Sequence, residues 1–256
     1  MMNKLILGIA VILAGHTGMA SASGFYVAAK AGATQVRSTE NTLSSSMLAG
    51  GLNNTVGEID VPSANRINFT PSFAMGYEFS TDWEQPVRLE LAYLAGGEVS
   101  QNSTLNTTMT SGWVDSGKFI QNLPVSVQRQ QKTRVSTLML NGYYDYTTGT
   151  PFTPYITGGV GVALLKNAAS LSQSSAGLSF SSDTFSQNNT QMAWSLGAGV
   201  AWALTPALSL DAGYLFTNAG DVTTEGTASN GIITSTWKSH THLQLHTLQL
   251  GLRYTF

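Results

Sequence analysis

The stretch Ile67-Asn68-Phe69-Thr70-Pro71-Ser72-Phe73-Ala74-Met75-Gly76-Tyr77-Glu78-Phe79 decides the fold class of this 256-residue chain. Its large apolar residues recur at every second position, and small or polar residues occupy most of the positions between them. This period of two is the signature of a β-strand whose two faces meet different surroundings. The apolar face ends in aromatic residues, which is typical of a lipid-facing strand with an aromatic girdle.

The same alternation recurs along the chain. Seven further segments carry it: 25–36, 87–98, 132–146, 152–165, 191–203, 208–217 and 246–256. The connections alternate between short ones near 80–86, 147–151 and 205–207 and long ones near 37–65, 100–131, 166–190 and 218–241. We therefore predict an all-β fold, an eight-stranded antiparallel up-and-down transmembrane β-barrel with short periplasmic turns and four long extracellular loops.

The N-terminus carries the pattern of a secretory signal peptide. A basic start with Lys4 precedes an apolar run from Leu5 to Ala14, and small residues at Ala20 and Ala22 follow. The run is too short to span the roughly 30 Å of hydrocarbon in a bilayer. We predict cleavage after Ala22, so that residues 1–22 are the signal peptide and 23–256 the barrel of a bacterial outer membrane.

The composition excludes several other classes of protein. Cysteine is absent, so disulfides do not stabilise the exported chain. Charged residues make up 10% of the chain, against roughly 25% in soluble domains. The net charge of −2 gives no basic surface for nucleic acid.

Seven charged residues fall on the small, inward-facing side of the predicted strands. They are Lys30, Glu78, Arg88, Glu90, Asp145, Asp211 and Arg253. Three are basic and four are acidic, and a buried charge needs a partner. We predict an ion-pair network that fills the lumen, and we keep a catalytic acid pair or a proton path as the alternative.

Four stretches resemble a known family. They are Gly24-Phe25-Tyr26-Val27, Leu140-Asn141-Gly142-Tyr143-Tyr144-Asp145-Tyr146, Pro154-Tyr155-Ile156-Thr157-Gly158-Gly159-Val160-Gly161 and Leu250-Gly251-Leu252-Arg253-Tyr254-Thr255-Phe256. They are similar to the opacity-type surface proteins, within the wider superfamily of eight-stranded barrels that includes the outer-membrane protein A type. The resemblance covers the strands between residues 24 and 256 but not the long loops.

The resemblance implies a monomer that the outer-membrane assembly machinery inserts among outer-membrane lipids. In such proteins the alternating last strand is read as an assembly signal, which here corresponds to Leu250, Leu252, Tyr254 and Phe256. Relatives act as adhesins, surface antigens or small pores.

Three histidines lie close together near the last strand. His240 and His242 share a face of a strand and could hold a metal ion between them, and His246 extends that face. Structural zinc sites recruit further ligands, and no cysteine is available, so we predict neither a metal site nor a cofactor and leave the role of these histidines open. A hydrolase alternative would use Ser239 beside His240, with Asp221 or Glu225 as the acid.

The function predicted from the sequence is that of a non-enzymatic surface protein. Its long loops would present binding surfaces for adhesion or for host and other extracellular ligands, because loops on a rigid scaffold commonly carry binding. A small porin of narrow conductance is the second possibility, and a lipid-modifying barrel enzyme is the third.

Overall fold

The computed structural model describes residues 24–49, 52–79, 86–113, 119–175, 178–181, 185–229 and 233–256. The predicted signal peptide lies outside these residues. The strands are β1 (Phe25–Ala49), β2 (Leu52–Asp60), β3 (Ala64–Glu78), β4 (Val87–Trp113), β5 (Phe119–Asp145), β6 (Phe152–Ser175), β7 (Leu178–Ser181), β8 (Phe185–Ala203), β9 (Leu208–Ser229) and β10 (Ile233–Thr255). Within these ranges, no helix has the length and apolar character needed to cross a membrane.

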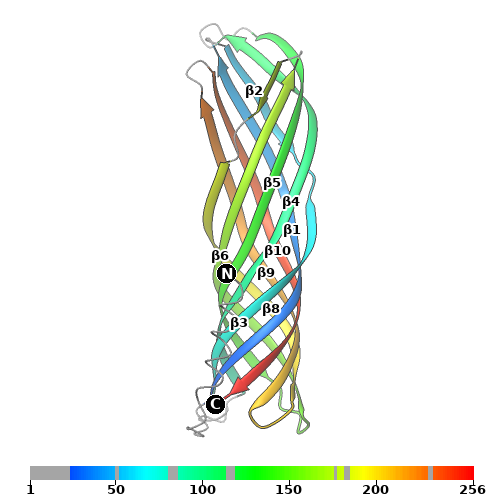
Figure 1. Cartoon of the computed structure of the whole chain (residues 1–256), viewed down its shortest axis with the longest axis vertical. Coiled ribbons are helices and arrows are strands. Elements are labelled where there is room, and N and C mark those ends of the chain that lie inside the picture. The colour runs from blue at the N-terminus through cyan, green and yellow to red at the C-terminus, as the bar shows by residue number, and fades with distance from the viewer. Residues whose placement is uncertain are drawn as a thin grey trace, which may run out of the picture.

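The strands form one closed antiparallel barrel (Figure 1). β10 pairs with β1 from Tyr26 opposite Thr255 up to Ala49 opposite Ile233, which closes the wall. β2 and β3 pair one after the other with the same side of β1, and the short β7 pairs with β6 next to the region where β8 pairs with it. The described strands therefore occupy eight positions around the barrel, which we call staves: β2 with β3 form one stave, β7 with β8 form another, and each remaining strand forms its own. The predicted fold class is confirmed.

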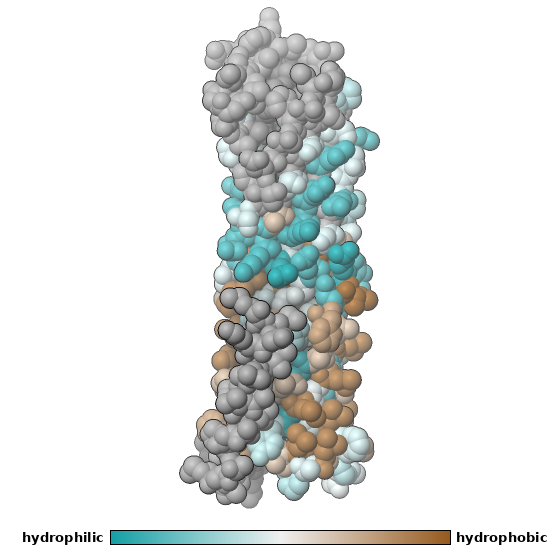
Figure 2. All heavy atoms as spheres, viewed as in Figure 1, coloured by the Kyte–Doolittle hydropathy of each residue, from teal (hydrophilic) through white to brown (hydrophobic). Residues whose placement is uncertain are grey.

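The prediction of four long loops is wrong for most of the described residues in those segments, because these residues form strands. β4 and β5 each contain 27 residues, and the β4–β5 ladder continues to Gly112 opposite Phe119. A tilted strand needs only about 9–11 residues to cross a bilayer. Figure 2 shows the result: the apolar surface is confined to the lower half, and a polar surface covers the described residues above it.

The reason for this error is that strand pairing and hydropathy contrast are separate properties. Above the bilayer both faces of the wall meet polar surroundings, so Ser, Thr, Asn and Gln occupy inward and outward positions alike. The backbone ladder persists there because it still satisfies the N–H and C=O groups. The period-two signal in the sequence ends at the membrane surface, whereas the strands do not.

The wall has a seam between β3 and β4. The Glu78 amide donates to Gly24 O beside β1 (2.7 Å) and the Phe79 amide to Val87 O on β4 (2.9 Å), so odd-numbered residues of β3 point their backbone groups towards β4. Pro71 is at such a position and has no N–H to donate. The β3–β4 ladder accordingly ends at Ser72 opposite Leu94.

β4 changes its own register at the same level. A bulge lies between Leu94 and Gly97, where two residues of β4 oppose a single residue of β5. Bulges bend a strand and commonly terminate pairing. Proline on one strand and a bulge on the other thus explain why β4 next pairs with this stave only where Leu52–Thr55 meet Thr110–Trp113.

Candidate functional site

The buried charges of the lumen are the most concentrated polar chemistry in the described part of the chain. Lys30 Nζ on β1 lies 2.8 Å from Glu90 Oε1 on β4, and Glu90 is 1% exposed. The Tyr143 hydroxyl donates to the same carboxylate oxygen at 2.8 Å, and the Tyr26 hydroxyl donates to the other oxygen at 3.1 Å. Glu90 therefore has one cationic and two phenolic partners, as a buried carboxylate requires.

A second pair lies beside the first. Arg88 Nε and Nη2 donate to the two carboxylate oxygens of Asp145 at 2.6 and 2.8 Å. The guanidinium carbon is 4.4 Å from the ring centroid of Tyr143 and 5.3 Å from that of Tyr155, within cation–π range. The fork geometry and the flanking rings hold Arg88 in one orientation, with 2% of its surface exposed.

The third group of charges connects the last strand, β10, to β3 and to β9. Arg253 Nη1 lies 2.8 Å from Glu78 Oε1 on β3, and Arg253 Nε lies 3.3 Å from Asp211 Oδ2 on β9. The structure thus places all seven residues selected from the sequence in the lumen and joins them in ion pairs. They come from six of the staves, so the contacts tie the lower barrel together across its interior.

Three tyrosines of this layer were missed by the sequence analysis. Tyr26, Tyr143 and Tyr155 are inward-facing and 1%, 6% and 5% exposed. The strand period contained the signal, because Tyr143 is two residues before Asp145 and Tyr26 is four before Lys30. Glycines opposite the rings provide the space: a Cβ at Gly199 would lie 2.5 Å from the Tyr155 ring.

Two further layers fill the lumen above the charges. A hydroxyl layer comes first, in which Thr34 Oγ1 lies 2.6 Å from Thr70 Oγ1 and 2.9 Å from Thr247 Oγ1. An apolar layer follows, and its buried members are Val36, Leu94, Val99, Val135, Met139, Ala163, Leu165, Ala193, Ala219, Val222, Leu243 and Leu245. Layers of charged, hydroxyl and apolar side chains therefore follow one another along the barrel axis. Together they fill the lumen, as side chains do in eight-stranded barrels.

The three histidines lie on the outer side of β10, near the upper limit of the apolar surface. His242 Nδ1 is 2.8 Å and His240 Nε2 is 3.7 Å from the same oxygen of Asp221, whereas His246 Nδ1 contacts the Tyr214 hydroxyl at 2.7 Å. No group of three potential ligands able to hold a metal ion occurs among the described residues.

The hydrolase alternative requires Ser239 and His240 to meet, and the strand separates them. Ser239 is 3% exposed and faces the lumen, while His240 faces outward to Asp221 and Thr223. Neighbouring residues of a strand point to opposite faces. This constellation is therefore not assembled.

Comparisons with known proteins agree with the architecture. The family model described as the outer membrane protein beta-barrel domain matches residues 5–256. This chain belongs to that family. It is located in the bacterial outer membrane, as the sequence analysis predicted.

Several relatives of this outer-membrane barrel are similar over most of the chain. Outer membrane protein PagN of Salmonella typhimurium is 30% identical over 251 residues, covering 97% of this chain and 96% of PagN. A candidate adhesin of Rickettsia prowazekii, RP828, is 26% identical over 184 residues, covering 71% and 78%. Among solved structures, Neisserial surface protein A shares 18% identity with a TM-score of 0.44, covering 92% of this chain and 99% of that one.

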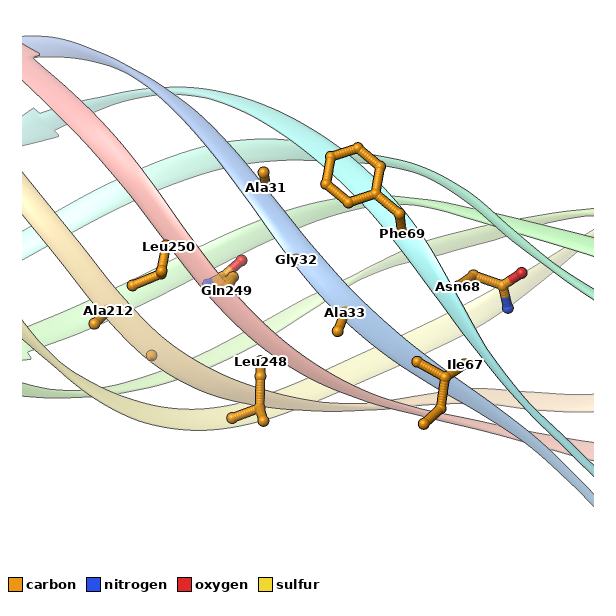
Figure 3. Close-up of a pocket in the computed structure, with 11 residues that line it drawn as sticks. Ala31, Gly32, Ala33, Ile67, Asn68, Phe69, Ala212, Leu248, Gln249 and Leu250 are labelled. Carbon is orange, nitrogen blue, oxygen red and sulfur yellow. The ribbon is translucent and has the colours of Figure 1, made fainter.

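The lipid-facing wall of the barrel carries an apolar groove of about 670 Å³ (Figure 3). Ala31, Gly32 and Ala33 of β1 form its floor. Large exposed residues flank it on both sides: Ile67, Phe69, Leu248 and Leu250. Because the groove has neither a titratable nor a nucleophilic side chain, it offers no catalytic chemistry.

The lumenal ion-pair network leads us to a prediction about the stability of the barrel. Arg88→Ala leaves the carboxylate of Asp145 in the lumen without its bidentate partner, and Glu90→Ala does the same to the ammonium of Lys30. We expect each change to lower the free energy of unfolding by about 3–5 kcal/mol, the usual cost of removing one partner of a buried pair. Urea unfolding of the refolded protein in lipid vesicles, followed by tryptophan fluorescence, measures it.

The control for this experiment is Glu225→Ala. Glu225 pairs with Lys238 at 2.9 Å on the surface, where both side chains are about 60% exposed, and we expect a change below about 1 kcal/mol. If Arg88→Ala and Glu90→Ala unfold at the wild-type urea concentration, the charged layer does not stabilise the barrel.

The layers of side chains that fill the lumen lead us to a second prediction, which concerns ion conductance. We expect no single-channel steps from the wild-type protein in planar bilayers, and none from Arg88→Ala, because the apolar layer lies above the charges and remains intact. Heat-shifted gel mobility confirms that both proteins are folded. Steps that appear in Arg88→Ala would mean that the charges alone close the lumen.

Proposed function

We propose that this protein is a non-enzymatic surface protein whose extracellular part mediates adhesion or contact with host ligands. The observation that carries the proposal is the height of the barrel. Strands of 27 residues extend about 90 Å along their own direction, or about 70 Å along the barrel axis after tilting, whereas the apolar band of such barrels is about 25 Å tall.

Such a wall is a rigid stalk above the membrane. It extends a binding surface away from the bilayer, and its ladder reduces the conformational entropy that such a surface loses on contact. The similarity to candidate adhesins over 71% of the chain supports the same proposal.

The two alternatives have less support. A porin needs a continuous polar path, and the apolar layer crosses the lumen between the hydroxyl layer and the extracellular side. A lipid-modifying enzyme needs an assembled nucleophile and base, and Ser239 and His240 lie on opposite faces of β10.

We also propose that the C-terminal strand carries the assembly signal implied by the family resemblance. Leu250, Leu252 and Tyr254 are exposed on the outer wall, and the Phe256 amide donates to Phe25 O at 2.9 Å. We expect Phe256→Ala to lower the amount of folded barrel in the outer membrane of cells while refolding in detergent proceeds as in the wild type. Equal amounts of folded barrel in cells would contradict the signal.

Adhesion is tested by shortening the tallest hairpin. Residues 103–129 are replaced by Asn-Gly, a two-residue turn that joins Asn102 to Gln130, which already pair across β4 and β5. We expect a non-adherent strain that expresses the wild-type protein to bind cultured cells, and the shortened variant to return to the level of the strain without the protein.

The matched control is Gly142→Ala, where the nearest atom to the added Cβ is 3.9 Å away and the extracellular part is unchanged. It should bind cells as the wild type does. If the shortened variant is folded, present at equal surface density and fully adherent, the extension is not the binding surface.

A further inference from the structure

Three cations form a patch on the outer wall of β5 and β6. Lys132, Arg134 and Lys166 are all exposed, and their strand neighbours Thr133, Val135 and Leu165 are buried on the lumenal side. Arg134 is directly opposite Lys166 in the β5–β6 register, and Lys132 is two residues further along the same face. The three side chains therefore share one surface.

The protein neutralises this patch only in part. Glu98 forms an ion pair with Arg134 at 3.2 Å, with side chains 36% and 60% exposed. Apart from Arg134, the cross-strand neighbours of the two lysines are Ser100, Ala168 and Asn188, which carry no charge. Like charges directly opposite each other on a sheet are destabilising, so the Arg134–Lys166 pair favours an external anion.

The height of the patch indicates where that anion comes from. Leu138 on β5 and Leu164 on β6 are exposed members of the apolar surface, and Lys166 follows Leu164 by two residues. Two residues of a tilted strand rise about 5 Å, which puts Lys166 and the opposite Arg134 within a headgroup layer that is about 5–8 Å thick on each side of a bilayer. Lys132 is two residues higher, at about 10 Å, and its long side chain can extend down to the lipid phosphates.

We propose that Lys132, Arg134 and Lys166 form a binding site for the phosphorylated headgroup of an outer-leaflet lipid. The acyl chains of that lipid lie against the apolar wall below, and the long lysine side chains extend along the wall to the phosphates. The site is independent of adhesion, because it is on the membrane surface and not at the end of the stalk.

The experiment uses the full folded protein in detergent and native mass spectrometry. Wild type, Lys166→Gln and the triple variant Lys132→Gln/Arg134→Gln/Lys166→Gln are titrated with bisphosphorylated lipid A and with the same lipid after dephosphorylation. Lys238→Gln is the matched control, because it removes one cation from a different surface, where it is paired with Glu225.

We expect binding of the phosphorylated lipid to weaken about fivefold in Lys166→Gln and about a hundredfold in the triple variant, from roughly 1 kcal/mol per cation at a membrane surface. Lys238→Gln should bind as the wild type does, and heat-shifted mobility shows that each variant is folded. Equal wild-type affinity for both lipids, or an unaffected triple variant, would overturn the proposal.

Two added competitors identify the source of the anion. If inorganic phosphate displaces the lipid at comparable concentration, the patch binds free phosphate and the lipid assignment fails. If heparin binds through the same three residues and the lipid does not, the patch belongs to the adhesive surface instead.

Discussion

Backbone N–H and C=O groups within hydrocarbon have no water to bind, and the closed wall of this protein follows from that constraint. The staves are paired with both neighbours through most of the membrane level, from the β1–β10 closure round to the β3–β4 ladder, which ends at Ser72. Where the ladder is interrupted, the interruption has a chemical cause: Pro71 offers no N–H towards β4, and β4 bulges at the opposite position. The seam begins near the upper part of the apolar surface, where Phe69 and Ile67 are still exposed.

Closure of eight staves leaves an interior that side chains must fill, and this protein fills it in layers. Near the periplasmic end, the charges pair across the lumen and tyrosine rings pack between them. Glycines on the facing strands, such as Gly76 against Tyr26 and Gly199 against Tyr155, compensate for the volume of these rings. The apolar layer above adds a dry barrier, and this combination suits a structural scaffold better than a channel.

The outer surface divides into an apolar lower part and a polar upper part (Figure 2). Below the division, exposed Leu, Val, Ile and aromatic residues face lipid. Above it, the exposed residues are mostly polar. They include the patch of Lys132, Arg134 and Lys166 on β5 and β6 and the histidines beside Asp221 on β10. The wall then continues as a polar stalk whose length exceeds what is needed to cross the membrane.

The sequence alone determined the class of fold and which residues of each membrane strand face lipid or the lumen. It thereby placed the seven charged residues on the lumenal side. Hydropathy contrast between lipid and lumen is written locally, in every second residue, so Lys30 and Glu90 could both be placed inside without knowledge of the register. Only the tertiary structure decided that these two residues, 60 positions apart, form a pair, and that Arg88 instead pairs with Asp145. It also decided the height of the barrel, because strand pairing above the membrane depends on cross-strand hydrogen bonds that leave no apolar period in the sequence.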